Sequence, residues 1–160
     1  MSRTAWCVPA GAADKLSLGV TVMPTDLPDI RPSDALGRRV RSTRRAERLA
    51  IKNKSVPDIF CEKRGVPSLS VDRLDHAPDQ DMTVIADQEP DSLGRSFLGW
   101  AVVRAEQAQQ DGRTVLPDAT LVNRYHASID LNIRPDVDHW AAQKGHSNAL
   151  ASYAIWRERA

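Results

Sequence analysis

The alternation of apolar and polar residues between Leu121 and Leu131 constrains the fold more than any other feature of the sequence. The apolar positions of this stretch are Tyr125, Ala127, Ile129 and Leu131, and the polar positions are Arg124, His126, Ser128, Asp130 and Asn132. Successive side chains of a β-strand point to opposite faces. The pattern therefore predicts a strand with one face on a core and one face in water, which is typical of an antiparallel sheet.

Length and composition favour one ordinary globular domain. The chain has 160 residues and two cysteines, Cys7 and Cys61, with no ligand-spaced partners. A chain of this size buries roughly 68–70% of its unfolded surface without help from disulfides or metals. No apolar run approaches the roughly 18 residues of a membrane span, and the N-terminus lacks the apolar core of a signal peptide. We expect a cytoplasmic location, reduced thiols and no membrane partner.

Local patterns predict alternating strands and helices. Strands are expected over residues 18–23, 68–74, 115–116 and 121–131, and helices over residues 33–53, 79–87, 91–110 and 135–159. This order predicts an α+β fold with a small sheet of three to four strands and about three main helices. We expect residues 18–160 to form a single compact domain, and residues 1–17 to be a flexible, loosely attached N-terminal segment.

The near-neutral total charge conceals two halves of opposite sign. The chain carries 22 basic and 21 acidic side chains, yet residues 1–64 sum to +6 and residues 65–160 sum to −5. Such asymmetry points to a polyanionic or acidic partner, or to pairing between the two halves. Arginine is the main basic residue, as expected for a bacterial, GC-rich coding sequence, and its planar fork suits phosphate recognition.

The basic residues concentrate in the stretch Arg38 to Arg48, which has six arginines and one acid. Helical spacing predicts an arginine-rich face with phosphate-binding candidates at Arg38, Arg41, Arg44, Arg45 and Arg48. Such a strip can bind nucleic acid in a steeply salt-dependent way. The same face could instead be solvated, pair with the acidic half, or dock on an acidic protein. The sequence leaves RNA and DNA equally open.

A second set of candidates lies on the polar face of the strand around His126. A histidine can accept a proton near neutral pH, and Arg124 could stabilise a developing negative charge. His146 or His139, on the last helix, could supply the second imidazole if that helix crosses the strand. These residues are the parts of a metal-independent nuclease, although any solvated strand face would also carry polar side chains.

The sequence lacks the other common motifs of catalytic and cofactor-binding sites. It contains no phosphate-binding glycine loop, dinucleotide fingerprint, nucleophile elbow or zincin motif, so it predicts neither a cofactor nor a metal site. Three hypotheses remain. The first is a small nucleic-acid-interacting accessory or effector protein, the second a metal-independent nuclease or related phosphodiester-acting effector, and the third an interaction module that binds an acidic partner or a second copy of itself.

Overall fold

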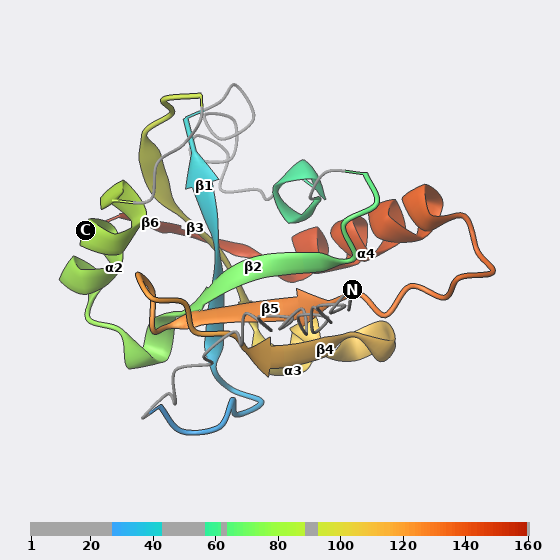
Figure 1. Cartoon of the computed structure of the whole chain (residues 1–160), viewed down its shortest axis with the longest axis horizontal. Coiled ribbons are helices and arrows are strands. Elements are labelled where there is room, and N and C mark those ends of the chain that lie inside the picture. Colours follow the sequence, from blue (N-terminus) through green and yellow to red (C-terminus); the bar gives the residue numbers. More distant parts are fainter. Residues whose placement is uncertain (1–26, 43–56, 62–63, 89–92, 160) are drawn as a thin grey trace, which may run out of the picture.

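The computed structural model describes residues 27–42, 57–61, 64–88 and 93–159. These residues form one α+β domain built on a six-stranded antiparallel sheet with three helices (Figure 1). The strands are β1 (Ala35–Arg41), β2 (Ser68–Arg73), β3 (Phe97–Arg104), β4 (Thr114–Pro117), β5 (His126–Asp130) and β6 (Ile155–Glu158). The helices are α2 (Asp79–Gln88), α3 (Ala105–Ala108) and α4 (His139–Tyr153), with 3-10 turns η1 (Pro57–Phe60), η2 (Leu74–His76) and η3 (Gln110–Gly112). The expected segment 1–17 and strand 18–23 lie outside the described residues.

The strand order is β4-β5-β2-β1-β3-β6, and every neighbouring pair is antiparallel. The sheet is thus wider than the three to four strands expected. Strand β1 pairs with β3 along its whole length but with β2 only at Leu36 and Gly37, so β1 and β2 diverge beyond that point (Figure 1). Within the described part of the chain, no helix is both long and apolar enough to cross a membrane.

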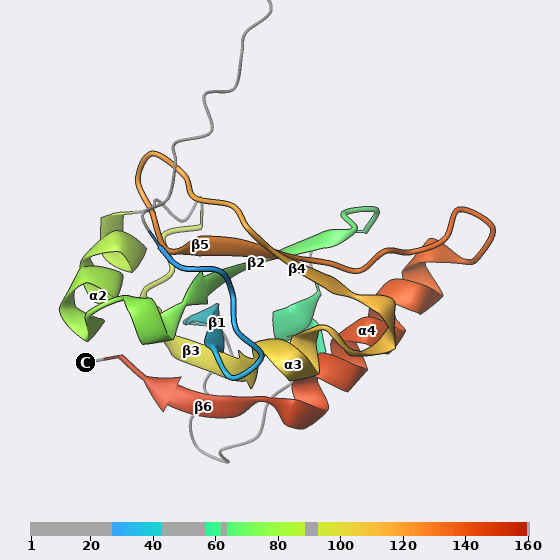
Figure 2. The same ribbon diagram turned by 90° about the horizontal axis from the view of Figure 1, so that it is seen from below.

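Each face of the sheet has its own apolar cluster. The α4 face, defined as the side that Leu150 of α4 covers, includes Leu36, Val71 and Ile129. The α2 face, which packs on Met82 of α2, is built around Trp100, Val102, Phe97 and Tyr125. Figure 2 shows α4 below β2 and β5, while α2 lies towards one end of the molecule, so that no helix of the described residues covers the outer side of these two strands.

The helix expected over residues 33–53 is wrong in its first part, because residues 35–41 form the strand β1. Gly37 shows why a strand fits here. A Cβ at this position would lie 2.6 Å from the Trp100 side chain and 2.7 Å from Leu74, so only glycine allows β1 to approach both. Long-range packing therefore overrides a weak local helical preference.

The helix expected over residues 91–110 is also wrong over most of its length. Residues Phe97–Arg104 form β3, which is buried on both faces at nearly every position, and only Ala105–Ala108 are helical. A short apolar run does not distinguish a buried strand from a buried helix by periodicity. The last helix similarly stops at Tyr153, because the residues from Ile155 onward pair with β3 as the edge strand β6.

The remaining predictions are confirmed at the level of element type. Strand β2, helix α2 and strand β4 lie within a few residues of their expected positions. Strand β5 is shorter than expected, since it begins at His126 rather than at Leu121. Its buried residues Ala127 and Ile129 belong to the α4-face cluster, as the alternation predicted.

Candidate functional site

The strongest candidate site lies at the start of β5, where His126, whose side chain is 15% exposed, points to the α2 face. The neighbours Ala127 and Ile129 point into the α4-face cluster, so His126 and Ser128 point to the opposite side. In the ladder with β2, His126 lies opposite Asp72 and Ser128 lies opposite Ser70. The strand predicted from alternation thus presents its polar row beside a second polar row on β2.

The connection between β4 and β5 fixes the orientation of the His126 ring. Nδ1 of His126 lies 2.7 Å from the backbone carbonyl oxygen of Asp118. A carbonyl oxygen only accepts hydrogen bonds, so Nδ1 donates and carries the hydrogen. In the neutral ring, Nε2 is then the acceptor. Among the described residues Nε2 has no hydrogen-bond partner, so its lone pair is available to a ligand.

The Asp118 side chain adds negative charge next to this ring. Its Oδ2 atom lies 3.6 Å from His126 Nδ1 and accepts a 2.7 Å hydrogen bond from the Ser128 hydroxyl. The carboxylate thus lies beside the Nδ1 edge of the ring, on the same side as the Asp118 carbonyl that orients it. Ser128 is bonded to Asp118 and not to the histidine, so these three residues are not a nucleophilic triad.

A buried polar network around Asp72 holds the loop that precedes His126. The Asp72 carboxylate is 2% exposed and pairs with Arg39 through two hydrogen bonds of 2.7 and 2.8 Å. It also accepts hydrogen bonds from Trp100 Nε1 at 3.2 Å and from Asn123 Nδ2 at 2.8 Å. Asn123 in turn accepts the Tyr125 backbone N–H. The network thereby links β1, β2 and β3 to the residues just before His126.

Arg124 does not continue the polar row, contrary to the expectation from sequence. Residues 124 and 125 lie in a turn that the His126 N–H closes on the Asn123 carbonyl at 3.3 Å. The turn breaks the alternation, so Tyr125 packs in the α2-face cluster and not with Ala127. The exposed Arg124 guanidinium lies 5.4 Å from the Tyr125 ring centroid and forms no ion pair with any described residue. It remains close to His126 in the chain and open to an anion.

The structure does not bring His126 and His146 together. His146 lies on α4, and its Nδ1 is 3.1 Å from a guanidinium nitrogen of the buried Arg113, on the opposite side of the sheet from His126. Burial lowers the pKa of His146 below its usual 6.5, and the Arg113 charge lowers it further against the opposing effect of Asp111. His139 is exposed at the first position of α4. Neither helix histidine completes an imidazole pair with His126.

The arginines that the sequence assigned to one helical face have different surroundings in the structure. Arg38 donates to the carbonyl oxygens of Ile59 and Ser70, and thereby bridges the gap where β1 and β2 diverge. Arg41 donates to the carbonyl oxygens of Arg95 and Ala86. The last three candidates, Arg44, Arg45 and Arg48, lie outside the described residues. The described arginines therefore have structural contacts, while these three are untested candidates.

A second polar cluster fastens the segment before β1 to the end of β2. Asp34 is 5% exposed, accepts the Arg31 N–H at 3.0 Å and lies 3.2 Å from His76 Nε2. Burial alone would raise the pKa of Asp34, but these hydrogen bonds and the charges of His76 and Arg73 hold it below its usual 3.8. The cluster is internally paired, which indicates a structural role.

No protein-family model matches this chain, and comparisons with curated proteins and with solved structures also found no match. Function is therefore inferred from the residues of the site. Within the described residues, no group of three or more His, Cys, Asp or Glu side chains is placed to hold a metal ion.

Proposed function

We propose that this protein binds nucleic acid and acts on a phosphodiester group at the start of β5, with His126 as the proton acceptor. The observation that carries the proposal is the Nδ1 hydrogen bond to the Asp118 carbonyl, which leaves Nε2 of the neutral ring as a base without a partner among the described residues. A positioned histidine of this kind typically contributes about 10²- to 10⁴-fold to a reaction rate.

The segment before His126 supplies groups that contact phosphates and bases, while the Asp118 carboxylate lies on the Nδ1 side of the ring and not at Nε2. Arg124, two residues before His126 in the chain, provides an exposed positive charge, and Ser70 and Ser128 lie on the same face of the sheet as His126. In the loop between β4 and β5, Leu121 and Val122 are 87% and 65% exposed. Exposed apolar side chains can contact the faces of unstacked bases, so the loop could hold bases while the strand binds phosphates.

A first prediction concerns His126→Asn. The asparagine amide can still donate to the Asp118 carbonyl, but it lacks the Nε2 base. We expect cleavage of a fluorescent single-stranded oligonucleotide to fall by about 10²-fold or more, while binding and the thermal midpoint change little. Gel analysis of the products measures cleavage, fluorescence anisotropy measures binding, and a thermal melt measures the midpoint.

The matched control is His139→Gln, which alters an exposed histidine at the start of α4. This control should cleave like the unaltered protein. Equal cleavage by the His126→Asn variant would contradict the assignment of the base, and the absence of any cleavage by the unaltered protein would contradict the catalytic part of the proposal.

A second prediction concerns the basic stretch that follows β1. We propose that the phosphate backbone is neutralised there, and that replacing three arginines together by glutamine removes most of the binding. The three positions are Arg44, Arg45 and Arg48. Each lost phosphate contact lowers the slope of log K against log salt by about 0.7 for a single strand, so a decrease of roughly 2 is expected. Fluorescence anisotropy at several salt concentrations measures it.

The control removes the same number of charges from exposed arginines elsewhere in the chain. Suitable positions are Arg31, Arg64 and Arg134. If both triple variants lose the same affinity, binding depends on net charge only and the local assignment is wrong.

The remaining hypothesis, an interaction module for an acidic protein or a second copy, stays a prediction. Size-exclusion mass at low and high salt tests it.

A further inference from the structure

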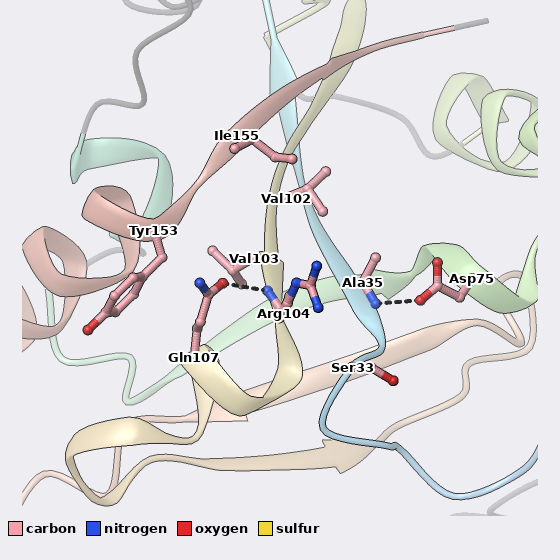
Figure 3. Close-up of a pocket in the computed structure, with 9 residues that line it drawn as sticks. All are labelled: Ser33, Ala35, Asp75, Val102, Val103, Arg104, Gln107, Tyr153 and Ile155. Atoms are coloured by element: carbon pink, nitrogen blue, oxygen red, sulfur yellow. Dashed lines mark hydrogen bonds between the residues drawn. The ribbon is translucent and has the colours of Figure 1, made fainter.

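A separate pocket lies where β1 begins, β3 ends and β6 begins (Figure 3). Its volume is about 480 Å³. Ligand sites for small molecules have volumes of about 300–1,000 Å³ and combine an apolar lining with a few placed polar groups. None of the residues proposed above to act on a phosphodiester lines this pocket, so it calls for an explanation of its own.

The apolar part of the pocket comes from neighbouring strands. Val102 of β3 lies opposite Ile155 of β6 in the ladder, and both line the pocket together with Ala35. Val102 is 8% exposed, whereas Ile155 is 68% exposed although it lies beside a concave surface. A ligand with a small aliphatic group would cover this isoleucine, because burial of apolar surface is favourable.

The pocket also contains a cation without a carboxylate partner. Arg104 ends β3, and in the described part of the chain its guanidinium has neither an ion pair nor a hydrogen bond. Figure 3 shows this side chain between Gln107 and Ala35. The Arg104 backbone N–H donates to Gln107 Oε1 at 2.9 Å, which fixes the amide and leaves its Nε2 hydrogens for a ligand. Arginine and an amide NH₂ together form a donor set suited to a carboxylate.

An opposite charge lies on the far side of Ala35. Asp75 lines the same pocket, and its Oδ2 accepts the Ala35 backbone N–H at 2.7 Å. Oδ1 has no hydrogen-bond partner among the described residues. The Asp75 carboxylate and the Arg104 guanidinium do not form an ion pair with each other, so the pocket presents one positive and one negative charge at separate positions.

The geometry points to a free α-amino acid with an aliphatic side chain as the ligand of this pocket. Its carboxylate would bind Arg104 and Gln107, its ammonium group would bind Asp75, and its side chain would cover Val102 and Ile155. A simple anion would be repelled by Asp75, and a simple amine would be repelled by Arg104. A zwitterion compensates both charges at once. This site is independent of the phosphodiester function proposed above.

Titration with L-leucine, followed by two-dimensional amide NMR, tests the inference. We expect saturable shifts confined to residues around Val102, Arg104 and Ile155. Two analogues each lack one charge: 4-methylpentanoate has no ammonium group and 3-methylbutylamine has no carboxylate. Each should bind about tenfold more weakly or worse, because one charged hydrogen-bonded contact is lost. No saturable shifts with leucine, or equal binding of either analogue, would overturn the inference.

Two variants locate the ligand. Arg104→Gln removes an exposed charge, and Asp75→Asn keeps an oxygen that can accept the Ala35 N–H, so both variants should fold. Each should weaken leucine binding about tenfold or more, whereas the control Arg134→Gln should not. Unchanged leucine affinity in Arg104→Gln would exclude this pocket as the binding site, even if leucine binds elsewhere.

Discussion

Replacement of Asp72 by alanine is expected to destabilise the protein by about 3–5 kcal/mol. The change removes the Asp72 carboxylate that pairs with Arg39, whose side chain is 14% exposed. It also removes the acceptors of Trp100 Nε1 and Asn123 Nδ2. A buried donor that loses its acceptor bears its full desolvation cost, and here Trp100 and Asn123 lose theirs. Because domains are stable by only about 5–15 kcal/mol, chemical denaturation will resolve the loss.

The matched control is Asp87→Ala, which breaks a surface pair with Arg159 whose side chains are 47% and 37% exposed. Such pairs contribute about 0–1 kcal/mol. An Asp72→Ala variant no less stable than this control would show that the network does not hold the sheet. The double variant Asp72→Leu with Arg39→Met should recover part of the loss, because it leaves no buried charge unpaired.

A second large loss of stability is expected for Gly99→Ala, where β3 pairs with β6. Gly99 has a φ of +152°, and a Cβ there would lie 2.3 Å from the Arg157 carbonyl oxygen and 2.8 Å from the Trp156 ring. Backbone strain of this kind costs about 1–3 kcal/mol. Overpacking costs about 1–3 kcal/mol more. We expect β6 to separate from β3, with much faster amide hydrogen exchange in Ile155–Glu158.

Gly145→Ala is the control for this prediction and should increase the stability of the protein, where Gly99→Ala decreases it. Gly145 lies inside α4, and a Cβ there meets nothing within 4 Å. Alanine is favoured over glycine in a helix interior by about 0.5–1 kcal/mol, so this variant should be slightly more stable. Unchanged exchange in β6 of the Gly99→Ala variant would contradict the steric argument.

The two proposed sites depend on these structural features in different ways. The Asp72 network holds Asn123 and therefore the loop that orients His126, so the Asp72→Ala variant should also lose the phosphodiester activity proposed here. The pocket beside Ile155 depends on β6 remaining paired with β3. The Gly99→Ala variant should consequently lose leucine binding before it loses binding of nucleic acid.

The sequence by itself determined the elements whose apolar residues follow one clear period. The alternation around Ala127 and Ile129 placed β5 and the face to which His126 points. Pro78 and Pro90 in the sequence bounded the segment that forms α2. Such patterns depend only on residues close together in the sequence. They can therefore be recognised without knowing which strands or helices pack against the segment. The tautomer of His126 did not follow from the pattern, because its partner is a backbone carbonyl that only the β4–β5 connection positions.

For the remaining segments, only the tertiary structure decided whether they form strands or helices and which of their residues come into contact. The local sequence of residues 35–41 weakly favours a helix. In the structure they form a strand, in which Arg39 pairs with Asp72 of β2 and Gly37 packs against Trp100 of β3. The run 97–104 satisfies helical spacing as well as a buried strand, and its two strand neighbours settle the choice. His126 and His146 are separated by the sheet, since the side of the sheet that a helix covers depends on chain topology and not on local spacing.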